Sequence, residues 1–302
     1  MRLTLDIMVL LFVFTMLLLT LLFAETVPEW RVHATGFVVA GVLYAGAVWV
    51  ARLLHNRFTG TTIHVVAVLG LFSFLFGAVA GLQHVFVNRW LDATVLRWEY
   101  ALVGKDIVVS LQEHVTPVLT ELMMFAYVVY VPLLPLVAIA CWRAAGPHAA
   151  IDYLMNLSLV NMLCYTGFIL FPVAGPMVHS PGVFSVPLDG GLFTWCGEWM
   201  RMNIHYPGGC LPSPHCAAAT VMLVMLYRYH RKLSYLVLPI VLTLYVSTVY
   251  GRYHYASDSV AGIFVAVIVL RSSPLLVRGV EYVTEKMRYQ VRPVSMPEST
   301  VE

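Results

Sequence analysis

Two short runs of the sequence place histidine beside groups that bind and activate anions. In the first run, residues 208–215, Ser213 and Pro214 are of the types that begin a helix, which puts His215 in the first turn. The free backbone N–H groups and the positive end of the helix dipole at such a position bind anions such as phosphate. The alternative is a plain helix start whose histidine faces lipid headgroups.

The second run, residues 247–258, contains a histidine and an aspartate four positions apart. On a helix His254 and Asp258 would share one face, so that their side chains could meet. An aspartate that accepts from one ring nitrogen fixes the tautomer and leaves the other nitrogen as a base or nucleophile. Arg252 adds a fork of donors that suits phosphate oxygens. The alternative is a helix-end ion pair between Arg252 and Asp258.

Together the two runs contain the parts of a phosphoryl-transfer site that needs no metal and no cofactor. His254, backed by Asp258, would be the nucleophile, and His215 would be the proton donor across the site. The arginine and the helix start would stabilise the charge on the phosphate. The sequence contains no P-loop, paired-carboxylate metal cluster or Gly-x-Ser-x-Gly run that would indicate another chemistry. Its cysteines and histidines also lack the spacing of a structural zinc site.

The composition indicates the class of protein that contains these residues. Of the 302 residues, 60% are hydrophobic and 11% are charged, and the mean hydropathy is +0.81. Because about 25% of a soluble domain is charged, this chain has too little charge to cover a soluble body of its size. The net charge of +2 gives no general attraction to nucleic acid, which excludes DNA and RNA as partners.

Eight apolar runs have about the length that spans the hydrocarbon core of a bilayer, which takes about 20 residues. We therefore expect an all-α, polytopic integral membrane protein with about eight transmembrane helices. No clear small-x-small cleavage site follows the first run, which favours a retained helix over a secretory signal. The eight runs are residues 7–23, 36–51, 62–82, 116–142, 151–171, 214–229, 233–250 and 256–277.

The distribution of positive charge predicts how these helices are oriented. With the N-terminus in the cytoplasm, 12 Lys and Arg residues fall on the cytoplasmic side and 6 on the outer side, as the positive-inside rule requires. Both termini are then cytoplasmic, and residues 172–212 and 251–255 are extracytoplasmic. The predicted active site therefore lies on the extracytoplasmic side.

We divide the chain into three parts. Residues 1–115 hold the N-terminal transmembrane helices and the segment 84–114, whose apolar spacing and Trp and Tyr content predict a helix in the membrane interface. A surface loop with some helix is the alternative. Residues 116–278 form the catalytic core, and residues 279–302 form a cytoplasmic tail that is too short for a soluble domain.

Two of the five cysteines, Cys196 and Cys210, fall in the long outer segment. They could form a disulfide if that side is oxidising, or they could stay free thiols. Both alternatives stay open, because cysteine pairing cannot be deduced from sequence.

At these residues the sequence resembles the type 2 phosphatidic acid phosphatase superfamily. The second motif of that family, Pro-Ser-x-His, appears as residues 212–215, and the third motif keeps the spacing of its Ser, His and Asp within residues 247–258. The resemblance implies that His254 attacks phosphorus to give a phosphohistidine, that Asp258 orients it, and that His215 protonates the leaving oxygen. It also implies a six-helix core, whose sixth helix would be the third apolar run or the interfacial segment.

The sequence departs from the family pattern in ways that resemble one branch of it. Thr248 stands where the third motif has arginine, and residues 171–177, which lack basic side chains, stand where the phosphatases have Lys and Arg-Pro. This loss resembles the branch of the inositol phosphorylceramide synthases, which are inositolphosphotransferase-like enzymes, and residues 98–106 also look like that branch. The candidates for phosphate binding are Ser213, Arg252, Arg201 and His179.

The sequence therefore predicts an integral membrane enzyme that acts on lipid phosphates or phosphoalcohols at the outer face. With water as the acceptor it would be a lipid phosphatase, and with the hydroxyl group of a lipid or polyol it would be a headgroup transferase. Two other classes stay open. Helix-breaking prolines and the membrane acid Glu121 would favour a transporter, and a catalytically inactive scaffold that binds lipid is the other alternative.

Overall fold

The computed structural model describes residues 1–204 and 206–290, and the regular elements of this part of the chain are all helical. The predicted all-α class is therefore confirmed. A helix satisfies its backbone hydrogen bonds within one segment, which a bilayer requires of an apolar stretch that crosses it.

Each of the eight predicted apolar runs forms a helix. Seven of these helices are long and apolar enough to cross a membrane, counted over the described residues, which confirms a multi-pass membrane protein. The eighth, α10, has 16 residues, which span about 24 Å at the usual rise of an α-helix. The eight helices are α1 (Arg2–Leu22), α2 (Trp30–Leu53), α3 (Arg57–Ala78), α6 (Pro117–Ala145), α7 (Pro147–Leu170), α10 (Pro214–Tyr229), α11 (Arg231–Tyr250) and α12 (Ala256–Gln290).

The short helix α10 lies at the centre of the bundle, in contact with α6, α7, α11 and α12. Its residues Ala217, Ala218 and Ala219 are fully buried. Small side chains of this kind let neighbouring membrane helices approach closely. These five helices form the core that carries both histidine runs.

The helix α3 packs along α7, beside these five helices, and the six-helix core that the resemblance implies stays a prediction. The interfacial segment instead meets the core near the beginning of α12. The remaining two helices lie further out, where α2 packs against α3 and α1 packs against α2.

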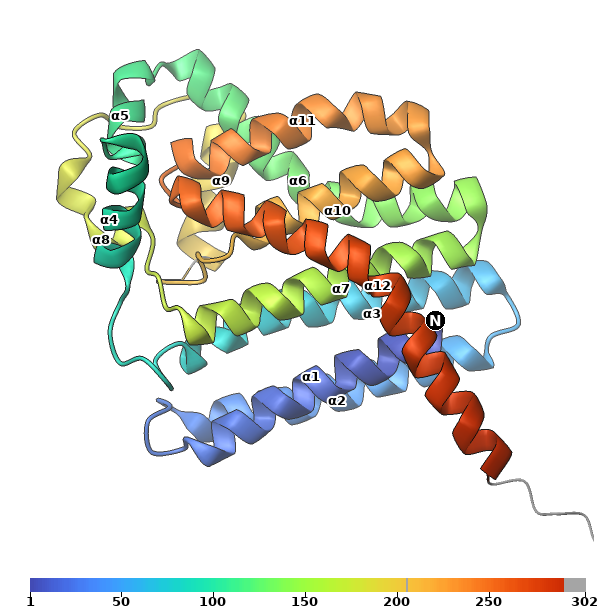
Figure 1. The fold of residues 1–302 in the computed structure, drawn as a ribbon. Helices are drawn as coiled ribbons and strands as arrows, with labels where there is room; N and C mark the ends of the chain where they lie inside the picture. The colour runs from blue at the N-terminus through green and yellow to red at the C-terminus, as the bar shows by residue number, and fades with distance from the viewer. Residues whose placement is uncertain (205, 291–302) are drawn as a thin grey trace, which may run out of the picture.

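Short helices gather at one end of the bundle, where α4, α5 and α8 lie beside the beginnings of α10 and α12 (Figure 1). The beginning of α1 and the C-terminal part of α12 lie at the opposite end (Figure 1). The two histidine runs therefore lie at the end of the bundle opposite to the beginning of α1 and the C-terminal part of α12. The short helices are η1 (Val79–Leu82), α4 (Asp92–Val103), α5 (Ile107–Ser110), η2 (Leu111–His114), α8 (Pro176–His179), η3 (Pro181–Val183) and α9 (Leu192–Ile204).

The segment 84–114 contains the predicted helix, which is α4. This helix has two different faces, since Val95 and Glu99 are buried whereas Trp98 and Tyr100 are exposed. Such a pattern fits a helix that packs on protein with one face and meets headgroups with the other. Its position in the membrane interface stays a prediction.

The structure overturns the disulfide alternative, because all five cysteines are free. Cys196 is half-buried on α9, whereas Cys210 is buried in the segment before α10. The thiol of Cys210 donates to the carbonyl oxygens of Gly208 and Tyr253, at 3.5 and 3.4 Å. The thiol of Cys210 thus donates to neighbouring backbone carbonyl groups and is not bonded to Cys196.

The last helix, α12, continues without a break through residue 279, where the predicted tail begins, and ends at Gln290. The rest of that predicted tail, residues 291–302, lies outside the described residues. The division of the chain at residues 115 and 278 stays a prediction.

The close contact between α10 and α12 gives a test of the packing. A Cβ at Gly262 on α12 would collide with the carbonyl oxygen of Ser213 and lie 3.3 Å from the backbone nitrogen of Ala217. We expect Gly262→Ala to lower the free energy of unfolding by about 1–3 kcal/mol, measured as a lower thermal midpoint of the purified protein in detergent. The matched control is Gly70→Ala on α3, where a Cβ would meet nothing within 4 Å. An unchanged midpoint for Gly262→Ala would contradict this packing.

Candidate active site

The first part of the site is the beginning of α10. Ser213 is the N-cap, as predicted, and its Oγ accepts a hydrogen bond from the backbone N–H of Cys216 at 3.4 Å. The backbone N–H of Ser213 itself donates to the carbonyl oxygen of Asp258 at 2.9 Å. This bond fastens the beginning of α10 to the beginning of α12. Together the two bonds engage the N–H groups of Ser213 and Cys216 within the protein, which leaves fewer N–H groups of the helix start for an anion.

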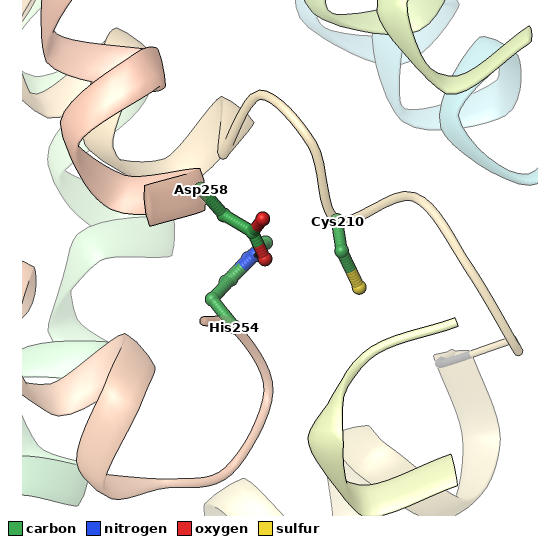
Figure 2. A group of neighbouring side chains, drawn as sticks. All are labelled: Cys210, His254 and Asp258. Atoms are coloured by element: carbon green, nitrogen blue, oxygen red, sulfur yellow. Dashed lines mark ion pairs between the residues drawn. The ribbon is translucent and has the colours of Figure 1, made fainter. Parts of the chain in front are cut away.

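The second part is the pair formed by His254 and Asp258. His254 lies in the short connection between α11 and α12, and Asp258 lies in the first turn of α12. The Nδ1 atom of His254 lies 3.5 Å from Oδ2 of Asp258, and both residues are buried. The same Oδ2 accepts the backbone N–H of Tyr255 at 2.9 Å, which holds the carboxylate in place. Figure 2 shows the imidazole and the carboxylate facing one another.

The connection before His254 is anchored by Thr248, the residue that stands where the family motif has arginine. Its carbonyl oxygen accepts the backbone N–H groups of Tyr253 and His254 at 3.2 and 3.0 Å. Its hydroxyl group lies 3.0 Å from that of Ser259. Thr248 thus positions the histidine through the backbone and adds no positive charge.

The two histidines of the separate runs meet in space. The ring centroids of His215 and His254 are 5.6 Å apart in an edge-to-face arrangement. His215 stacks on Tyr127 of α6 with centroids 5.1 Å apart, and Tyr127 stacks in turn on Tyr253 at 4.7 Å. Tyr127 was not predicted as a site residue, because no motif surrounds it in the sequence. Its ring forms one wall of the site and restricts the orientation of His215.

A cavity of about 80 Å³ opens between these side chains. A water molecule occupies about 30 Å³ in the liquid, so the cavity has room for a group a few atoms across. Arg201 of α9 lines it and binds Oε2 of Glu198 through Nε and Nη2, at 2.7 and 2.6 Å. The hydrogen bond with Glu198 raises the pKa of Arg201. The lining residues are Phe76, Tyr127, Met200, Arg201, Ile204, Gly208, Gly209, Cys210, His215, Tyr253 and His254.

The structure does not bring the other predicted phosphate ligands into the lining of this cavity. Ser213 is fully buried as a helix cap, and His179 is exposed at the end of α8. Arg252 has a left-handed backbone with φ of 63°. Its guanidinium binds the carbonyl oxygen of Val186 and lies over the ring of Phe184, 4.5 Å from the centroid. Arg252 thus holds the outer loop 184–186 and does not form the alternative ion pair with Asp258.

A buried carboxylate of α4, which was not predicted from the sequence, connects two segments of the site. Asp92 is fully buried. Its two oxygens accept the backbone N–H groups of Ala174 and Gly175, each at 2.9 Å, and the hydroxyl group of Tyr255 at 3.0 Å. Asp92 therefore holds the loop that stands in place of the first family motif against the residue that follows His254. No local pattern marks it, since its partners lie about eighty or more positions away in the sequence.

A second carboxylate of α4, Glu99, contacts the same region. Its Oε1 accepts the backbone N–H of Ser257 at 2.6 Å, which caps the beginning of α12. Burial raises the pKa of Glu99. The carboxyl groups of Asp92, Glu99 and Asp258 therefore lie near the site but outside the lining of the cavity, whereas Arg201 is part of that lining.

The protonation state of His254 suits a nucleophile. Burial lowers the pKa of His254 to about 4, and a hydrogen bond with the backbone of Cys210 opposes this shift in part. At neutral pH the imidazole is therefore uncharged and keeps a lone pair. A neutral imidazole beside a carboxylate and a second histidine is an arrangement that can perform nucleophilic and general acid–base chemistry.

Comparison of the sequence with models of known protein families identifies the family of this chain. A family model described as the PAP2 superfamily matches residues 93–271, which include both histidine runs, the helices α6, α7, α10 and α11, and the first part of α12. The chain belongs to the PAP2 superfamily. No curated protein and no solved structure matches it with significance. Membership supports a function of the lipid phosphatase or phosphotransferase type, and it confirms the predicted resemblance at the level of the superfamily.

The lowered pKa of His254 can be measured directly. We expect the ring carbon NMR signal of His254, in protein labelled at histidine and assigned with His254→Ala, to stay that of the neutral form from about pH 8 to about pH 6 and to titrate with a pKa of about 4. The unfolded chain binds this proton near pH 6.5. The pair should therefore lose stability as the pH falls below that value. A midpoint at or above the ordinary histidine value would contradict the burial of a neutral ring.

Proposed function

We propose that this protein is a membrane-embedded enzyme that transfers the phosphoryl or phosphoalcohol group of a lipid through a phosphohistidine at His254. The observation that carries the proposal is the convergence of His215 and His254 on one small cavity, with Asp258 against the ring of His254. The two histidines come from separate runs of the sequence, so their approach is a property of the fold. The superfamily match supports a reaction at phosphorus.

The first half-reaction transfers the group to the enzyme. The lone pair of a His254 ring nitrogen attacks phosphorus, the N–P bond forms, and the bond from phosphorus to the leaving oxygen breaks. Protonated His215 gives its proton to that oxygen and becomes neutral. The carboxylate of Asp258 stabilises the positive charge that develops on the His254 ring.

The second half-reaction returns both histidines to their starting states. Neutral His215 takes the proton from the hydroxyl group of the acceptor, whose oxygen attacks phosphorus. The N–P bond then breaks, and its electron pair returns to His254. Arg201 and the beginning of α10 would stabilise the phosphate oxygens in both steps.

We infer the orientation in the membrane from charge and topology together. The site lies at the end of the bundle opposite to the beginning of α1 and the C-terminal part of α12 (Figure 1), and the positive-inside rule predicts that this opposite end faces the cytoplasm. The site would then open on the extracytoplasmic side.

A headgroup transferase related to the inositol phosphorylceramide synthases is the second candidate. It is favoured by the loop 171–177, which lacks basic residues and which Asp92 holds beside the site. The burial of His254, whose exposed fraction is 3%, also limits the access of water to a phosphohistidine. A simple phosphatase needs no second substrate, since water is its acceptor. The identity of the acceptor, water or a hydroxyl group of a second substrate, therefore distinguishes a phosphatase from a headgroup transferase.

Purified protein in liposomes can distinguish these candidates. The substrates are radiolabelled phosphatidic acid, an isoprenyl diphosphate and phosphatidylinositol, each with and without ceramide or diacylglycerol as acceptor. We expect free phosphate or a labelled acceptor lipid from wild type, and a loss of at least about a thousandfold in His254→Ala, because the nucleophile is gone. The control is His148→Ala, an exposed histidine at the beginning of α7, which should keep wild-type activity. Equal activity in folded His254→Ala would contradict the mechanism.

A further inference from the structure

Three donors of different chemistry meet beneath the cavity. The Sγ of Cys210, a ring nitrogen of His254 and a carboxylate oxygen of Asp258 all lie within 4.8 Å of one another. They come from the segment before α10, from the connection after α11 and from α12 (Figure 2). The exposed fractions are 2%, 3% and 0%, so the three groups face each other away from bulk solvent.

Two atoms of this cluster lack hydrogen bonds in the described part of the chain. These are Nδ1 of His254 and Oδ1 of Asp258, both fully buried. Buried polar atoms without partners cost free energy. A group that accepts their lone pairs would recover that cost, and a cation of suitable size is such a group.

The charges around the cluster favour a cation. A divalent ion would balance one carboxylate and one thiolate, which gives a neutral set of ligands in a buried place. Asp92 and Glu99 of α4 place two further carboxyl groups close by, and Asp92 acts electrostatically on both Cys210 and Asp258. Such surroundings lower the energy of a bound cation.

The donor types select the kind of metal. Sulfur, imidazole nitrogen and one carboxylate oxygen are the ligands of Zn²⁺ and similar soft or borderline ions. Mg²⁺ and Ca²⁺ instead require mainly oxygen ligands. Three protein ligands leave the fourth tetrahedral position open toward the cavity.

We propose that Cys210, His254 and Asp258 form a binding site for Zn²⁺ or a similar ion, and that this ion blocks the reaction. Binding breaks the S–H bond of Cys210, whose proton passes to solvent, and forms an S–metal bond. The neutral ring of His254 and the carboxylate of Asp258 each give a lone pair to the ion. Nothing is oxidised or reduced. The hydrogen bonds from the thiol to Gly208 and Tyr253 are lost.

Two consequences follow from this exchange of a proton for a metal. A thiol must lose its proton to bind a metal, so the affinity should increase with pH. An occupied site also engages the lone pair of His254 and the carboxylate that orients it. The blocking effect rests on the proposed function, whereas binding of the metal does not.

The binding test uses Co²⁺ as a spectroscopic probe on the full-length protein in detergent. We expect wild type to show a thiolate-to-cobalt charge-transfer band in the near ultraviolet. Cys210→Ser should lose this band and bind Co²⁺ at least about tenfold more weakly, while its hydroxyl group can still donate to the backbone. The matched control is Cys196→Ala, outside the cluster, which should keep the band. No band in wild type, or a band that survives in Cys210→Ser, would overturn the proposal.

A second measurement does not depend on a folded Cys210 variant. X-ray absorption of Zn²⁺-loaded Cys196→Ala protein should show one sulfur at about 2.3 Å and nitrogen or oxygen neighbours at about 2.0–2.2 Å. Neighbours of nitrogen and oxygen alone would overturn the site.

The activity assay separates this proposal from the proposed function. Zn²⁺ should abolish turnover by wild type, a chelator should restore it, and Mg²⁺ should have no effect. A cobalt band in a protein without lipid phosphatase or transferase activity would support the metal site and count against the proposed function. Turnover that persists while the metal site is saturated would overturn the blocking effect.

Discussion

The hydrogen bond from the backbone N–H of Ser213 to the carbonyl oxygen of Asp258, 2.9 Å long, sets the geometry of the site. It joins the beginnings of two helices that are separated in the sequence by the whole of α11. Gly262 makes the approach possible, because a side chain there would collide with Ser213. Once the two helix starts are fixed, His215 in the first turn of α10 faces His254 just before α12. The position of each histidine thus depends on backbone contacts more than on its own side chain.

The amphipathic helix α4 braces this junction from outside the core. Asp92 and Glu99 bind backbone N–H groups of the loop 171–177 and of α12, so the loop and the helix start cannot move independently of α4. This bracing brings negative charge near His254, the proposed nucleophile. In our proposal a phosphate therefore binds from the cavity side, where Arg201 lies. The same negative charge favours a metal cation in the pocket formed by Cys210, His254 and Asp258.

Local patterns predicted much of this arrangement. The apolar runs predicted the eight helices of the bundle, and the Ser-Pro pair predicted the beginning of α10. The spacing of four also predicted the contact between His254 and Asp258. The expected shared helix face was wrong, however, because His254 lies in the connection before α12. The existence of the N-terminal helices also followed from hydropathy alone, since a helix is the usual solution for a long apolar segment in a bilayer.

Long-range contacts and irregular turns were not predicted from the sequence. Arg252 stands two residues before His254, but its left-handed backbone turns its side chain toward residues 184–186 and away from the cavity. Helical periodicity cannot predict where a side chain points in such a turn. Asp92 and Tyr127 reach the site from other segments of the chain, and no spacing in one sequence records that approach. The state of Cys196 and Cys210 likewise depended on the tertiary fold.

The central claim is that phosphorus becomes bonded to His254, and trapping this intermediate tests it most directly. Purified protein is mixed with phosphatidic acid that is radiolabelled at phosphorus, quenched in alkaline detergent and separated from lipid. Our account predicts a label on wild-type protein that is stable in alkali and lost in acid, as expected for a phosphoramidate, and no label on folded His254→Ala. A label that persists in His254→Ala, or wild type that turns over without acquiring label, would contradict the account.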